Sequence, residues 1–183
     1  MISPVYTAEL AEQSICHRNV ALGAGGDAGE EGVFISTRLL RDRFSLAFEL
    51  FINVGHAFVD EAGVPESFGE LAWNQAVADV RGETSQDAWE SRAQAVGGGQ
   101  TAGLGGQPRI DEKARTEYIE AAFSDAVAIY MLSLAVDFDY SELREREYPL
   151  LAPQALTERL RLVARLFPAN AEYEFAIRYR RRA

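Results

Sequence analysis

The sequence contains a single cysteine, Cys16, so no disulfide can form within one chain. It contains one lysine, Lys113, among 18 basic residues, and only two histidines. The first residues lack a basic start followed by an apolar run, so we expect no secretory signal peptide. We also expect no segment long and uncharged enough to cross a bilayer. These absences predict a soluble protein, either cytoplasmic or exported without a classical signal.

Basic charge is also scarce relative to acidic charge. The 183 residues carry a net charge of -10, and the pI is about 4.7. Nucleic acids and anionic membranes repel such a surface, so neither is expected as a partner. The Arg-rich ending, residues 178–182, is read as a solvated tail or as a docking element for an acidic surface. Hydrophobic residues make up 48% and charged residues 25%, which is typical of a soluble globular protein.

The apolar pattern predicts one domain, residues 1–183, of mainly α-helical (α+β) class with a small strand component. Long helices are expected from about 43 to 62 and from about 112 to 136, with Gly63 closing the first. Residues 33–36 read as a short strand because two of the four are β-branched. Pro153 is expected in the first turn of a last helix, whose apolar face carries Leu156 and Leu160.

Two further helix starts are predicted from capping boxes. Ser67 is followed by Glu70 and Thr84 by Asp87, and a hydroxyl followed three residues later by an acid is a helix-start signal. Between the second of these helices and the helix at 112, residues 97–108 are rich in glycine. We expect this stretch to be a flexible internal loop, since glycine leaves the backbone unrestrained and gives little to bury.

The segment FELFINVGHAFVDEAG, residues 48–63, is mostly apolar but carries a polar stripe. Glu49, Asn53, His56 and Asp60 recur at helical spacing, so they share one face of the predicted helix. Such a stripe is either a polar network tolerated in the core or a site. The glycine-rich run 23–28 does not compete with it as a nucleotide site, because a strand follows it where a helix would be needed.

The run GHAFVDEAG resembles the sequence around the second histidine of gluzincin-type zinc metallopeptidases, which carry His-Glu-x-x-His on a helix. The segment EYIEAAFSDAVAIY, residues 117–130, is similar to the helix that supplies their third ligand. The resemblance implies a zincin-like two-helix site in which His56 is the second histidine ligand and Glu120 the third ligand. It also implies that Asp125 is the acid that orients a histidine, and that Asp60 is the acid downstream of the motif.

The sequence departs from that family at two positions that the chemistry requires. Ile52 occupies the place of the first histidine and has no lone pair for a metal. Asn53 occupies the place of the catalytic glutamate and cannot act as a base. A catalytic zinc site needs three protein ligands, so we expect no cofactor. Zinc would be expected only if the site retained function, with His56 and Glu120 as its ligands.

The residues therefore predict a catalytically inactive, metallopeptidase-like domain that binds a protein or regulates one. The polar stripe would then be a vestigial site, kept as a hydrogen-bonded core network. Three alternatives remain open: a weak or atypical metal-dependent hydrolase, a structural subunit of a larger assembly, and an unrelated helical protein that matches by coincidence. The sequence itself names neither the partner nor the oligomeric state.

Overall fold

The structure is a computed structural model, and helices make up most of its described part. It describes residues 16–21, 31–97, 110–143, 148–166 and 168–175, with the backbone alone for 16–21, 31–34, 141 and 142. The helices are α2 (Arg43–Ala62), α3 (Glu66–Val77), α4 (Gln86–Gly97), α5 (Glu112–Ala135) and α6 (Pro153–Leu166). A short 3-10 helix, η1 (Thr37–Arg41), precedes α2, and another, η3 (Tyr140–Leu143), follows α5. The prediction of a mainly helical chain is confirmed.

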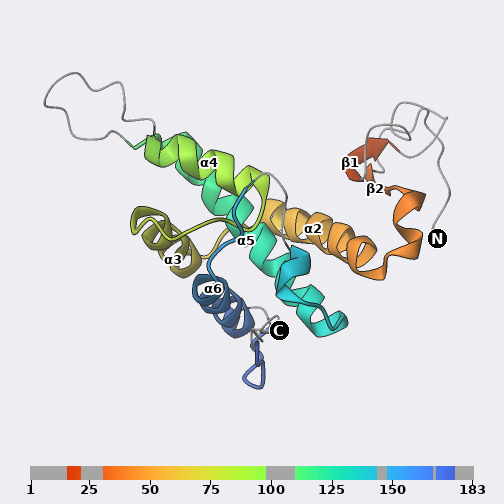
Figure 1. Ribbon diagram of the computed structural model, residues 1–183. Coiled ribbons are helices and arrows are strands. Elements are labelled where there is room, and N and C mark those ends of the chain that lie inside the picture. The colour runs from red at the N-terminus through yellow and green to blue at the C-terminus, as the bar shows by residue number, and fades with distance from the viewer. Residues whose placement is uncertain (1–15, 22–30, 98–109, 144–147, 167, 176–183) are drawn as a thin grey trace, which may run out of the picture.

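Helix α5 forms the centre of the fold. It contacts α2, α3, α4 and α6, and every residue from 121 to 126 is buried. Figure 1 shows α4 alongside its first half, α3 and α6 on one side, and α2 crossing its middle. By length and composition α5 could cross a membrane, contrary to our expectation that no segment could, and 61% of its most apolar window is buried inside the protein. Such burial is typical of a core helix.

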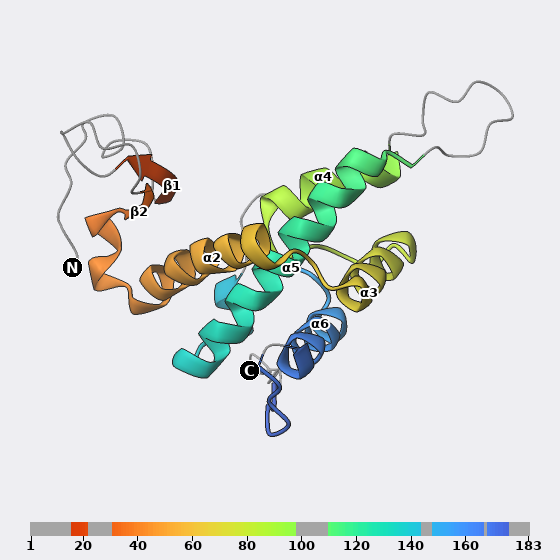
Figure 2. The same ribbon diagram turned by 180° about the vertical axis from the view of Figure 1, so that it is seen from behind.

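Helix α2 begins and ends where the sequence predicts. Its first turn is capped by Asp42, whose carboxylate accepts a hydrogen bond from the Ser45 amide at 3.1 Å. Gly63 closes the helix with a φ of 70°, a conformation that favours glycine. Figure 2 shows α2 crossing α5 on the side toward the viewer.

The two capping boxes were wrong predictions. Helix α3 begins after Pro65 with no side-chain cap, one residue before Ser67. Helix α4 is capped by Ser85, whose hydroxyl oxygen accepts from the Ala88 amide at 3.2 Å. The Thr84 hydroxyl instead donates to the buried carboxylate of Asp125 at 2.8 Å. The tertiary contact with Asp125 thus replaces the helix-capping role that the local sequence predicts for Thr84.

Two strands precede the helices. They are β1 (Cys16–Ala21) and β2 (Glu31–Ile35), which pair antiparallel with an irregularity between His17 and Val20. Strand β2 covers most of the strand predicted at 33–36. In Figure 1 the pair lies by the start of α2, away from α3 and α6. Of the predicted loop at 97–108, Gly97 ends α4 and the rest lies outside the described residues, as does the Arg-rich ending.

The loop between α3 and α4 is fixed to the segment that leads into α6. Glu83 and Leu150 form a parallel bridge, in which Glu83 N–H donates to Pro149 and Leu151 N–H donates to Glu83. Gly82 has a φ of 80°, and a Cβ there would collide with the Leu150 carbonyl. The bridge holds residue 83 inside the helical core.

Candidate functional site

Helices α2 and α5 cross at a point of very close backbone approach. Gly55 lies on Ser124, and a Cβ at residue 55 would overlap the Ser124 carbonyl oxygen. The Phe58 and Phe123 rings lie 6.3 Å apart, and the Phe44 and Phe138 rings 5.5 Å apart. Residues near the end of α2 therefore meet the middle of α5, whereas the start of α2 meets the segment that follows α5. The helix that carries His56 does pack against the helix that carries Glu120.

The predicted site residues on α2 are in different environments. Asn53 is buried, and its amide donates to the Glu49 carbonyl at 2.7 Å, one turn earlier in the same helix. Ile52 and His56 are half-buried, and Asp60 is exposed. Asn53 is thus buried with a hydrogen bond inside its own helix, whereas Asp60 is on the surface.

The predicted residues on α5 do not complete a two-helix metal site. Glu120 is exposed. Asp125 is buried, and its carboxylate accepts a hydrogen bond from the hydroxyl of Thr84, a threonine rather than a histidine. Burial raises the pKa of Asp125 from 3.8 to about 7, although hydrogen bonds from Ser85 and Thr84 oppose this rise. Among the described residues no three His, Cys, Asp or Glu side chains come together in a way that could hold a metal ion.

A different polar cluster, which the sequence analysis missed, lies in the core. We call it the Glu83 network. It takes one buried side chain from each of α3, the following loop, α4, α5 and α6: Gln75, Glu83, Arg92, Tyr118 and Arg159.

The carboxylate of Glu83 is the centre of this network. Its Oε2 accepts from Arg159 Nη1 at 2.9 Å. Its Oε1 accepts from Arg92 Nη1 at 3.1 Å and from the Tyr118 hydroxyl at 2.9 Å. Arg159 extends the network by donating from Nε to Gln75 Oε1 at 2.8 Å. One carboxylate thus joins three helices, and Gln75 adds the fourth.

Arg92 also ties α4 to the end of α3. Its guanidinium donates to the carbonyls of Val80 at 2.7 Å and Gly82 at 3.1 Å, and to the Ala76 carbonyl at 3.4 Å. The last carbonyls of a helix carry partial negative charge, so a buried cation is favourable there. Asp79, whose side chain is exposed, approaches the same guanidinium at 3.5 Å. These acceptors compensate for the burial of a second arginine beside one glutamate.

The charges of the network stabilise one another. Burial, the largest single effect, lowers the pKa of Arg159, but the Glu83 carboxylate and the Tyr118 hydroxyl together outweigh it and raise that pKa above its ordinary value. Burial raises the pKa of the Tyr118 hydroxyl well above its usual range, so this phenol stays protonated and can donate. The groups are held by one another and by main-chain carbonyls, so their role here is to fix the packing of four helices.

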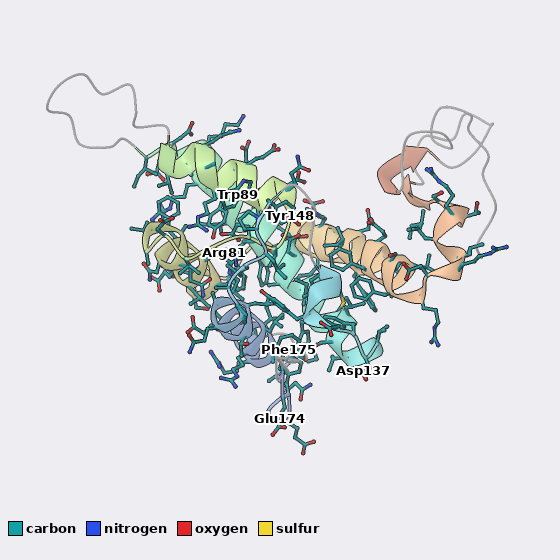
Figure 3. The ribbon with its side chains drawn as sticks, in the orientation of Figure 1. Arg81, Trp89, Asp137, Tyr148, Glu174 and Phe175 are labelled. Atoms are coloured by element: carbon teal, nitrogen blue, oxygen red, sulfur yellow. The ribbon has the colours of Figure 1, made fainter. Side chains whose placement is uncertain are left out.

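One signal in the sequence could have revealed the network. In α6, Arg159 stands in the apolar series of Leu156, Leu160 and Val163, where a charge is expected only if it is paired. Tyr148, labelled in Figure 3, adds a nearby hydrogen bond by donating to the Thr84 carbonyl at 3.2 Å. No local pattern marks Glu83, which lies in a loop.

The outer face of α2 is apolar and uncovered in the described structure. Only Asn53, Gly55 and Val59 of this helix are buried, whereas α5 buries twelve residues. Leu50 is 45% exposed and Val54 43% exposed. They lie one turn apart on the side of the helix opposite the Val59 contact, so they form part of one face.

Comparison with protein-family models, with curated proteins and with solved structures found no match to this chain.

Proposed function

We propose that this chain is a non-catalytic, protein-binding helical module, built on a scaffold related to the gluzincin zinc peptidases, and that α2 is its binding element. The observation that carries the proposal is the contrast between α2 and α5. Both helices are rich in apolar residues, yet α5 buries twelve residues and exposes Leu134 near its end, whereas α2 buries three and leaves Leu50 and Val54 in solvent. An apolar helix face that none of the described elements covers is a suitable surface for a partner.

The placement of the former site residues supports the non-catalytic half of the proposal. The base position is Asn53, whose amide is engaged with the Glu49 carbonyl. The third-ligand position, Glu120, is exposed, and Asp125 is engaged with Thr84. Residues 52 and 53 thus supply neither a ligand nor a base, and the remaining polar groups serve the fold. The relation to gluzincins rests on the two motif segments and on the packing of the helices that carry them.

The proposal is tested by photocrosslinking within cells that express the full chain. A photoreactive amino acid at position 54 should give discrete protein adducts, identified by mass spectrometry. The matched control is position 77, because Val77 is an exposed valine at the end of α3, at 62% exposure. Adducts at 54 and not at 77 are the expected result. No protein adduct at 54, or steady peptide hydrolysis by the purified chain that requires Glu120, would overturn the proposal.

A further inference from the structure

The exposed face of α2 carries residues whose spacing is the same when counted from either end. Six residues follow one another at spacings of four and three, which places them in a single line along the helix. We call this line the α2 stripe: Arg43, Ala47, Leu50, Val54, Ala57 and Glu61. Ala47 is half-buried and the other five are exposed.

The α2 stripe is symmetric about the level of residue 52. Leu50 and Val54 lie equally far from that level, and so do Ala47 and Ala57. The outermost positions, Arg43 and Glu61, carry opposite charges. If a second α2 is laid antiparallel on the first, with a two-fold axis at residue 52, each apolar residue meets an apolar residue. Each Arg43 then meets Glu61 of the other copy, as a self-complementary interface requires.

Beyond the capping carboxylate of Asp42, the charges within the two ends of α2 are opposite to those that would stabilise the helix by itself. Its first turn contains no acid and its last turn no base, although acids near the N-terminus and bases near the C-terminus are favourable. Instead Arg43 stands at the start, and Asp60 and Glu61 near the end. Within the chain as far as it is described, neither Arg43 nor Glu61 enters an ion pair. An antiparallel copy supplies the missing opposite charges at both ends.

We infer that the occupant of this surface is a second copy of the chain, and that two α2 helices pair antiparallel through the α2 stripe. This inference rests on the proposed function, because it names the partner of the same surface. The small side chains of Ala47 and Ala57 let the two helices approach closely on either side of a Leu50–Val54 centre. In Figure 2 no other labelled helix lies in front of α2.

The test is the oligomeric state of the full chain, measured by sedimentation over the micromolar range. The wild type should form a dimer. Val54→Glu should give a folded monomer, because it places two carboxylates in the apolar centre of each dimer. The control Val77→Glu adds the same charge at an exposed valine outside the α2 stripe and should leave the dimer intact. A monomeric wild type, or a dimer that Val54→Glu leaves unchanged, would overturn the inference.

A charge reversal tests the antiparallel register. Arg43→Glu or Glu61→Arg alone should weaken the dimer by about fivefold to tenfold, because each change affects two exposed ion pairs per dimer. The double variant Arg43→Glu with Glu61→Arg should restore the wild-type dissociation constant. Failure of this restoration, with both single variants weakened, would refute the register. Circular dichroism confirms the fold of each variant.

The two proposals fail in distinguishable ways. Crosslinks from position 54 to another protein, together with a monomeric wild type, would refute self-association and leave the binding function standing. Crosslinks from position 54 to a species of twice the chain mass, together with a wild-type dimer that Val54→Glu dissociates, support both. The absence of any crosslink from position 54, with a monomeric wild type, would refute both.

Discussion

Arg159 donates from Nη1 to Glu83 Oε2 at 2.9 Å, and both side chains are fully buried, at 0% exposure. Arg159 belongs to α6, whereas Glu83 belongs to the loop between α3 and α4. Removing one partner of such a pair leaves the other charge buried without compensation, which costs more than the pair contributes when intact. The Glu83 network therefore makes the packing of α3, α4, α5 and α6 depend on one carboxylate.

Substitution of Glu83 should consequently be severe. Glu83→Gln keeps the shape but leaves Arg92 and Arg159 without their shared anion, so we expect a loss of about 3–5 kcal/mol in the free energy of unfolding. The measurement is urea denaturation at neutral pH. Glu117→Gln is the control, because Glu117 pairs with Lys113 on the surface of α5, and its loss should stay below about 0.5 kcal/mol. Equal effects of the two substitutions would contradict the role given to the network.

The close crossing of α2 and α5 predicts opposite outcomes for two helical glycines. Gly55→Ala should destabilise the protein, since its Cβ would overlap the Ser124 carbonyl and force the helices apart. Gly69→Ala places its Cβ at 3.5 Å from Ile119 Cγ2, an ordinary contact. The second change should therefore be neutral or stabilising by up to about 1 kcal/mol, through helix propensity. Thermal denaturation of the two variants compares them, and a stable Gly55→Ala variant would disprove the close approach.

The raised pKa of Asp125 predicts that the protein becomes less stable as the pH rises. Its pKa in the folded chain is raised from 3.8 to about 7, mainly by burial. At this carboxyl group the folded state binds a proton more tightly than the unfolded state, so protonated Asp125 stabilises the fold. That contribution is lost progressively as the pH rises from the lower of the two pKa values to the higher. Asp125→Asn removes this titration. The stability of the variant relative to the wild type should improve by about 1–3 kcal/mol from pH 4.5 to pH 8.

Asp42 is the control for this pH dependence. Hydrogen bonds from Ser45 lower the pKa of Asp42 below 3.8, so its contribution to stability is lost only as the pH falls through that acidic range. Asp42→Asn should therefore shift stability by the same amount at pH 5 and at pH 8. If the relative stability of the Asp125→Asn variant were equally flat, the raised pKa of Asp125 would be wrong.

The proposed relation to zinc peptidases is tested by restoring the missing groups. Ile52→His with Asn53→Glu recreates His-Glu-x-x-His around His56, with both histidines on one side of α2. If the scaffold descends from such an enzyme, the double variant should bind zinc at least about tenfold more tightly than the parent, as measured by competition with a chelator. The gain should disappear on His56→Ala and weaken on Glu120→Gln.

The restoration carries a stability cost that has to be measured with it. Asn53 is buried and Ile52 half-buried, so the double variant should lose about 2–4 kcal/mol of unfolding free energy. Zinc in excess should recover part of that loss, because a ligand that binds only the folded state stabilises it. A folded double variant with no gain in zinc affinity would count against the relationship.

The sequence by itself determined the helices whose signals are local. Helix α2 occupies the predicted residues 43–62, and α5 ends one residue before the predicted 136. Gly63 and Pro153 stand at the predicted end of α2 and start of α6. These elements are readable because apolar periodicity, a left-handed glycine and a first-turn proline each act over a few neighbouring residues.

Only the tertiary structure decided which polar residues belong together. Glu83 and Arg159 are 76 residues apart, and the sequence around Glu83 carries no periodic signal that would place it in the core. The contact with Asp125 overrode the helix cap predicted at Thr84, and Glu120 and Asp60 are exposed although their motif predicted a shared site. The physical reason is that a buried charge is stabilised by partners from other elements. Helical spacing fixes the side of a helix on which a residue lies, and the packing of the other helices decides what covers that side.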